Sequence, residues 1–191
     1  MKVLMALWIM LFSVTPLAAQ PISIDRPTWT NGDTWTYREG NLTLTFVVRG
    51  ETSNGYAVER LDKDRHHVSM MHWDRDLLFE DAVFFHPQWP LETGKQWQFT
   101  HHTTAGNGIS GVNDYVVTET VVGVESVSVP AGTFQSIRIH GKDCNITQHN
   151  YCGDFDVWYA PQVKYTVRIK RQAGYWSTND TRELVSYKVS P

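Results

Sequence analysis

The sequence has few cysteines, no excess of positive charge and only one long hydrophobic run. Two cysteines among 191 residues are too few for a small domain held together by disulfides. Lysine and arginine number 17 against 20 acidic residues, and the net charge of −3 argues against a nucleic-acid binder. No glycine-rich phosphate loop precedes a helix, which argues against nucleotide binding. With 41% hydrophobic and 13% aromatic residues, the chain can instead fold as a globular domain with a substantial core.

The hydrophobic run lies at the amino terminus. Lys2 precedes an apolar stretch over residues 3–14, and small residues follow up to Ala19. This order is typical of a secretory signal peptide, and the run is too short to span a bilayer comfortably. We therefore expect residues 1–19 to be a cleaved signal peptide and residues 20–191 to form one domain. No cysteine lies near the cleavage point, so we expect a periplasmic or secreted protein without a lipid anchor or a membrane-spanning segment.

Export also explains the two cysteines. Cys144 and Cys152 are separated by seven residues, and an oxidising compartment would join them. A metal site is the alternative, because His140 and His149 are close in sequence. Two cysteines in an exported chain usually pair with each other, so we predict a disulfide near the end of a hairpin.

Alternation of apolar and polar residues with a period of two dominates the chain. It predicts strands with one buried face at residues 42–49, 136–140, 163–170 and 185–189. Turn residues separate such segments at 38–41, 53–55, 130–132 and 173–174. No part of the mature chain has convincing helical periodicity. We predict an all-β protein with a single curled antiparallel meander sheet of about nine to ten strands, a half-barrel or a barrel.

Two short segments of the chain resemble each other. Residues 32–37 and 94–99 both read Gly-x-x-Trp-x-aromatic, so that a glycine turn leads into a strand with two rings on one face. Six residues carry little information about common origin. We therefore interpret the similarity as one strand-entry device used twice rather than as a duplication.

Four motifs in the same order resemble the signature of a large family of uncharacterised exported bacterial proteins. They are Trp29-x-x-Gly32-Asp33-x-Trp35-x-Tyr37, Pro90-Leu91-x-x-Gly94-Lys95-x-Trp97, Val-Pro-Ala-Gly-Thr-Phe at 129–134 and Trp-Tyr-Ala-Pro at 158–161. That family resembles lipoprotein-carrier proteins, in which a curled antiparallel sheet wraps a hydrophobic concave face. The resemblance covers most of the mature chain. Its motif residues are aromatic, glycine and proline, which implies shape rather than chemistry. The segment between the two cysteines is not part of the pattern, and Lys164 stands where the family often has glycine.

The aromatic residues are the most unusual feature. A curled sheet can fill its concave face with its own rings or leave room for an apolar ligand, and both interpretations stay open. The residues expected on this ligand face or core are Trp35, Tyr37, Trp97, Phe99 and Trp158.

The clearest charge cluster consists of Lys164, Arg168 and Lys170, which alternate along one predicted strand. A solvated strand face is the simpler interpretation. The functional interpretation is a docking face for anionic lipid headgroups or for an acidic partner.

The histidines are the first place to look for catalysis or metal binding. His66, His67 and His72 on one segment, and His101 and His102 on another, could supply metal ligands. Along a strand, however, His66 and His72 would be roughly 20 Å apart, so a second strand would have to complete a site. We therefore expect no metal site and no cofactor.

The sequence also offers little support for catalysis. It has no Gly-x-Ser-x-Gly motif, and both cysteines are expected to be in the disulfide. Same-face carboxylates at Asp74 and Asp76, and at Asp154 and Asp156, are more often charges that protect strand edges. We expect no catalytic residues.

These observations favour an exported, non-enzymatic half-barrel that binds an apolar small molecule or lipid, or supports an envelope assembly. The alternative is a protein-interaction module that uses strand edges and the disulfide-tipped hairpin to contact an envelope protein. A metal-assisted hydrolase is the least favoured hypothesis.

Overall fold

The computed structural model describes residues 22–75, 86–104, 112–147, 151–172 and 181–191. The expected signal peptide at 1–19 lies outside these residues, as do the turn expected at 173–174, His149 and Asp76. Within the described part of the chain, every regular element is a β-strand. No helix there is long and apolar enough to cross a membrane.

The described residues form twelve strands. Their bounds are β1 Ser23–Ile24, β2 Thr34–Glu39, β3 Leu42–Glu51, β4 Gly55–Leu61, β5 His67–Asp74, β6 Leu91–Glu92, β7 Gln96–Thr104, β8 Val112–Val129, β9 Gly132–Asn145, β10 Tyr151–Ala160, β11 Tyr165–Arg171 and β12 Thr181–Lys188. The turns expected at 38–41, 53–55 and 130–132 lie between β2 and β3, β3 and β4, and β8 and β9, as predicted.

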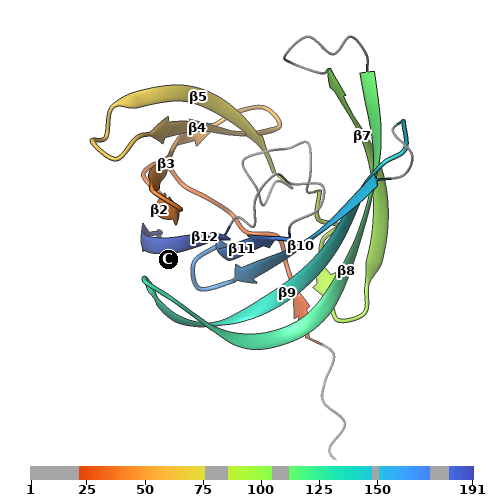
Figure 1. The fold of residues 1–191 in the computed structure, drawn as a ribbon. Coiled ribbons are helices and arrows are strands. Elements are labelled where there is room, and N and C mark those ends of the chain that lie inside the picture. Colours follow the sequence, from red (N-terminus) through yellow and green to blue (C-terminus); the bar gives the residue numbers. More distant parts are fainter. Residues whose placement is uncertain (1–21, 76–85, 105–111, 148–150, 173–180) are drawn as a thin grey trace, which may run out of the picture.

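Ten of these strands form one antiparallel sheet in the order β5-β4-β3-β2-β12-β11-β10-β9-β8-β7. The sheet therefore consists of two meanders, β2–β5 and β7–β12, which join where β12 pairs with β2. The edge strands β5 and β7 stand at opposite sides of the curled sheet and do not pair, so it is not closed (Figure 1). β1 and β6 form a separate pair. The predicted all-β class and half-barrel are confirmed, and the closed barrel is excluded for this sheet.

Two glycines mark places where long strands bend. The pairing register shifts between Val48 and Gly50 in β3, and between Val121 and Gly123 in β8. Both glycines have positive φ, at 156° and 149°. A bulge of this kind increases the twist of a strand and bends it, so it helps a wide sheet to curl.

The two Gly-x-x-Trp segments enter the sheet in the same way. Gly32 and Gly94 both have positive φ, 93° and 84°. The Gly32 N–H donates to the Val48 carbonyl, and the Gly94 N–H donates to the Val121 carbonyl, each at 2.8 Å. Each valine N–H donates back to the residue after the glycine at 2.9 Å. The shared backbone pattern supports one strand-entry device used in both halves.

The core is divided between the two halves of the sheet. One cluster includes Trp35, Phe46 and Trp73 of β2–β5, packed with residues of β11 and β12 and with a few residues of β8, β9 and β10. The other consists of Leu91, Trp97, Val117, Val121, Ile137, Ile139, Phe155, Val157, Tyr159 and Ile169. A row of directly paired residues crosses the sheet without a break, from Glu39 on β2 to Val121 on β8. It passes through β12, β11, β10 and β9. Since directly paired residues share a face, Tyr37, Val121 and their same-face neighbours define one inner face of the sheet.

Candidate ligand-binding face

Trp35 and Tyr37 lie within a packed group of rings on the inner face. This aromatic cluster consists of Trp29, Trp35, Tyr37, Phe46, Tyr56, Trp73 and Tyr165, with contacting ring centroids 5.1–6.4 Å apart. The Trp35 indole donates to the Val163 carbonyl at 2.9 Å, and the Tyr37 hydroxyl donates to the Thr166 carbonyl at 2.7 Å. Burial raises the pKa of Tyr37 above its usual value. In the β2–β5 half, the protein's own rings fill the inner face.

Trp97 and Phe99 lie on β7, in the other half of the sheet. Trp97 is buried and belongs to the second core cluster, and Phe99 packs against that cluster while remaining half-buried. The ring of His86 meets Phe99 edge-on, with 4.8 Å between centroids. The structure therefore separates Trp97 and Phe99 from the aromatic cluster. We call β7, β8, β9 and β10 the β7–β10 wall.

Trp158 points to the opposite side of β10 from Val157, but it is buried, with 6% of its surface exposed. Its register partners are Arg138 and Arg168, and each guanidinium carbon is 5.8 Å from the centre of the indole ring. The indole N–H donates to the Glu125 carboxylate. Its neighbour Val157 belongs to the inner-face cluster. Trp158 nevertheless belongs to the same core cluster as Trp35 and Tyr37, whereas Trp97 and Phe99 belong to the other cluster. Charged side chains border its ring on both sides.

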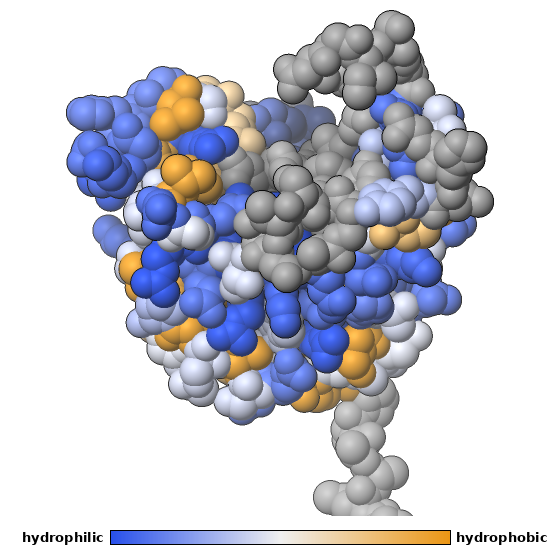
Figure 2. All heavy atoms as spheres, in the orientation of Figure 1, coloured by the Kyte–Doolittle hydropathy of each residue, from blue (hydrophilic) through white to orange (hydrophobic). Residues whose placement is uncertain are grey.

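The three basic candidates do not form a uniform strand face. Lys164 precedes β11 in a turn, has φ of 58°, and its Nζ is 3.4 Å from the Pro191 carbonyl. Arg168 pairs with Glu183 through two contacts at 2.9 and 3.1 Å, whereas Lys170 is exposed. One of the three positive charges is thus already paired within the protein. Figure 2 shows hydrophobic residues scattered among hydrophilic ones on the surface in view.

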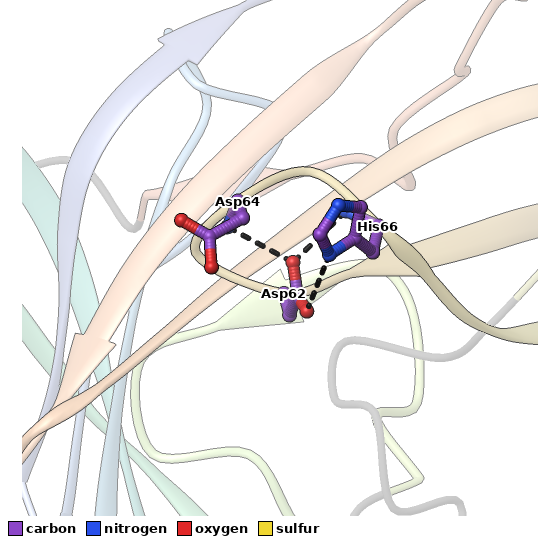
Figure 3. A group of neighbouring side chains, drawn as sticks. All are labelled: Asp62, Asp64 and His66. Atoms are coloured by element: carbon purple, nitrogen blue, oxygen red, sulfur yellow. Dashed lines mark hydrogen bonds and ion pairs between the residues drawn. The ribbon is translucent and has the colours of Figure 1, made fainter.

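The histidines are dispersed over the sheet. His67 pairs with Glu59 at 2.8 Å, and His102 pairs with Asp114 at 2.6 Å. Among the described residues, the only cluster with metal-ligand spacing is Asp62, Asp64 and His66 in the β4–β5 loop (Figure 3). Asp62 accepts backbone hydrogen bonds from the other two residues, both at 2.9 Å. Its carboxylate therefore organises the turn, and these bonds lower its pKa.

One candidate carboxylate pair is already paired with basic side chains. Asp156 accepts a hydrogen bond from Arg138 at 2.9 Å and lies 3.1 Å from His140. Asp154 is 3.8 Å from the same histidine. Of the other pair, only Asp74 is among the described residues. Asp156 is 3% exposed, so it is a buried, paired charge rather than a charge on the wet face of the sheet.

The predicted disulfide is confirmed. Cys144 and Cys152 are bonded and face each other across the β9–β10 pair. They lie close to the tip of this hairpin, next to the exposed Ile146 and Tyr151.

Removing the disulfide by the double substitution Cys144→Ala and Cys152→Ala is expected to lower the free energy of unfolding by about 2.5 kcal/mol. The physical reason is that the bridge reduces the chain entropy of the unfolded state, and the closed loop is short. Denaturant unfolding of the oxidised protein and of the variant, in the presence and absence of a reductant, measures the effect. If reductant lowers the stability of the double variant as much as that of the wild type, the bridge is not the cause.

Two acids and a histidine lie on the inner face of the β7–β10 wall. Glu119 and Asp143 are fully buried, and His101 is 8% exposed. In β8, Glu119 lies between the buried Val117 and Val121 on the same face. The alternation Val117-x-Glu119-x-Val121 was readable from the sequence and marks an acid at an apolar position. We did not single out either acid from the sequence, and His101 was considered only as a metal ligand.

Burial controls the ionisation of this group. It raises the pKa of Asp143 to about 7 and the pKa of Glu119 well above its usual value. It lowers the pKa of His101 to about 4, with further lowering by His102 and His86. His101 Nε2 is 3.5 Å from Asp143, and its ring stacks on Tyr115 with 4.6 Å between centroids. A neutral His101 therefore supplies no positive charge to Asp143 near pH 7.

Comparisons with known proteins give similarity of overall shape only. No protein-family model and no curated protein matches the chain, so the family resemblance remains a prediction. Similar solved structures include a protein from Bacteroides fragilis that is named as exported and as having a YmcC-like fold (14% identity, TM-score 0.49, 87% of this chain and 100% of that chain). Others are the hypothetical lipoprotein YmcC of Escherichia coli K12 (10%, 0.49, 84% and 85%) and a protein of Parabacteroides distasonis named as a lipoprotein (12%, 0.49, 86% and 99%). Identities this low carry no information about the residues of a site.

Proposed function

We propose that the chain is an exported, non-enzymatic protein that binds a small, largely apolar molecule on the inner face of the β7–β10 wall. The observation that carries this proposal is the pair of buried carboxyl groups, Glu119 and Asp143, on a largely apolar inner face. Neither accepts a hydrogen bond of normal geometry from another described residue.

Burying these two carboxyl groups without hydrogen-bond partners lowers the stability of the folded protein. Leaving a buried polar group without a hydrogen-bond partner costs on the order of 1–3 kcal/mol, and more when the group is charged. Strongly perturbed titratable groups are concentrated at functional sites, because binding or catalysis can compensate for such a cost. A bound molecule that pairs with the carboxyl groups would supply the missing interaction.

The surroundings of the two carboxyl groups favour an apolar ligand body. The same face carries Val117, Val121, Ile139, Phe155 and Val157. The β2–β5 half offers no equivalent surface, because the aromatic cluster fills it with its own rings. The β7–β10 wall is therefore the better candidate for the ligand face.

Export and the lack of catalysis are supported by separate features. The expected signal peptide at 1–19 and the disulfide between Cys144 and Cys152 suit an oxidising compartment outside the cytoplasm. Because both cysteines are in that bridge, neither is available as a nucleophile.

Binding of the uncharged fluorescent probe N-phenyl-1-naphthylamine tests the proposal. We expect saturable binding with increased emission, because an apolar face excludes water from the probe. Phe99→Ala should weaken binding at least threefold, since Phe99 is half-buried beside this face. Leu42→Ala, at an exposed position on β3, is the control and should leave binding unchanged. Absence of saturable probe binding, together with native mass spectra that contain no bound molecule, would contradict the proposal.

A further inference from the structure

Glu119 lies between aromatic side chains on the inner face. Its register partner on β7 is Trp97, and its partner on β9 is Gly141. The ring of Phe155 lies directly over Gly141: a Cβ added to this glycine would be 2.0 Å from Phe155 Cζ. The Trp97 indole offsets part of the rise in the Glu119 pKa, but completes no hydrogen bond of normal geometry to it. The carboxyl group is thus flanked by an indole on one side and a phenyl ring on the other.

Asp143 is the diagonal neighbour of Glu119 on the same face. Glu119 pairs with Gly141, two residues before Asp143 on β9. Diagonal neighbours across antiparallel strands have Cα atoms about 7–8 Å apart. A single small group on the inner face can therefore approach both carboxyl groups.

No lysine or arginine among the described residues pairs with Glu119 or Asp143. Among the described residues, only His101 comes within ion-pair distance of Asp143, and none comes within it of Glu119. On the inner face of β11 and β12, Arg171 and Arg182 pair with Glu39 at 3.3 and 2.6 Å. In sequence, the internal segments 76–85, 105–111, 148–150 and 173–180 contain no lysine or arginine.

Two carboxyl groups beside aromatic rings suit an organic cation. An ammonium group can pair with a carboxylate and at the same time lie against an aromatic face, where the electrons of the ring attract it. A metal ion is less suitable: Glu119, Asp143 and His101 do not bring three ligand atoms within 4.8 Å of one another, unlike Asp62, Asp64 and His66. An anionic ligand would be repelled once the carboxyl groups ionise.

We propose that the inner face of the β7–β10 wall binds the ammonium group of an amphipathic amine, with Glu119 and Asp143 as its counter-charges and the apolar floor as the site of its hydrocarbon part. This inference rests on the proposed ligand-binding function and specifies the chemistry of the ligand.

Displacement of N-phenyl-1-naphthylamine by octylamine, 1-octanol and octanoate tests the inference at pH 7.5 with the mature, oxidised chain. The three compounds share a hydrocarbon chain and differ in the charge of the head group. We expect octylamine to displace the probe at a concentration at least tenfold lower than 1-octanol, and octanoate to be the weakest. Glu119→Gln and Asp143→Asn should each remove most of the preference for octylamine over 1-octanol.

A matched control and a pH series complete the experiment. Asp114→Asn, on the outer face of the same strand as Glu119, should not change the preference. Between pH 8 and pH 5 the affinity of wild-type protein for octylamine should fall, because Asp143 takes up a proton around pH 7 while the amine stays charged. If all compounds displace the probe but octylamine has no advantage, or if the advantage survives both acid substitutions, this inference is wrong. Failure of every compound and of the probe itself would instead contradict the proposed function.

Discussion

Replacing Trp35 with alanine is expected to lower the free energy of unfolding by about 3–5 kcal/mol. Trp35 has no exposed surface, and its ring contacts Trp29, Trp73 and Tyr165. The substitution would leave a cavity inside the aromatic cluster and would also leave the Val163 carbonyl without its indole donor. Since domains are stable by about 5–15 kcal/mol, this loss would be a large part of the total. Denaturant unfolding followed by far-ultraviolet circular dichroism measures it.

Two further variants separate the causes of this loss. Trp35→Phe keeps a large ring but removes the indole N–H, so it should cost less than the alanine substitution. Tyr187→Ala removes an aromatic side chain that is 39% exposed and should cost about 1 kcal/mol or less. A loss below about 1 kcal/mol for Trp35→Ala would mean that the rings do not fill the β2–β5 half as a packed core. The reason for placing the ligand in the other half would then be lost.

Replacing Asp143 with asparagine is expected to raise the free energy of unfolding at pH 8 by on the order of 4 kcal/mol in the absence of ligand. In the folded protein the pKa of Asp143 is raised from 3.8 to about 7, because burial disfavours its charged form. The folded state therefore holds the proton more tightly than the unfolded state. The stability that this tighter proton binding adds to the folded state is fully present below about pH 4. It is lost as the pH rises to about 7. Asparagine stays uncharged and avoids this loss.

The pH dependence of the difference between variant and wild type is the measurement. The gain should be close to zero at pH 4 and should grow up to about pH 7. His101 shifts wild-type stability in the opposite direction, since its pKa is lowered to about 4 and its contribution is lost as the pH falls. The wild-type profile alone is therefore not a sufficient readout. An equal gain at pH 4 and pH 8 would show that the ionisation of Asp143 is not the cause, and Asp114→Asn is the control for a partly exposed acid.

These two predictions concern the two halves of the inner face, whose side chains affect stability in opposite directions. The rings around Trp35 complete one another, so the β2–β5 half gains stability from its own side chains. The acids at 119 and 143 reduce stability when they are ionised, so the β7–β10 wall keeps an unfavourable arrangement. A gain in stability on substitution, together with a loss of amine binding, would identify this arrangement as a functional one.

The strands and most of their connections could be predicted because the information is local. Alternation in residues 42–49 and 163–170 defines buried faces, and the turn residues near Gly40, Gly55 and Gly132 end the strands where expected. The disulfide could also be predicted, because the chain has only two cysteines and its expected signal peptide implies an oxidising compartment. The order in which the strands pair across the whole sheet was harder to predict, because β2 and β12 pair although they are far apart in sequence.

The candidate ligand face was only partly predictable. Trp35 and Trp97 occur in similar motifs, and nothing local reveals that one lies in a filled core and the other near a polar group. Trp158 shares a core cluster with Trp35 and Tyr37, but its register partners Arg138 and Arg168 could not be identified from the local sequence. Lys164 was expected to share a strand face with Arg168, but it lies in the preceding turn with positive φ.

The scarcity of cysteine, the single apolar run at the amino terminus and the period-two alternation by themselves determined an exported-type sequence, an all-β class and one disulfide. These properties depend on neighbours in the chain, which the sequence lists directly. Only the tertiary structure decided which half of the inner face is filled with rings, and that Glu119 and Asp143 are buried as diagonal neighbours with no lysine or arginine of the described residues paired to them. Burial and pairing depend on strands that are distant in sequence, because the pKa of a carboxyl group is set by everything that surrounds it in space.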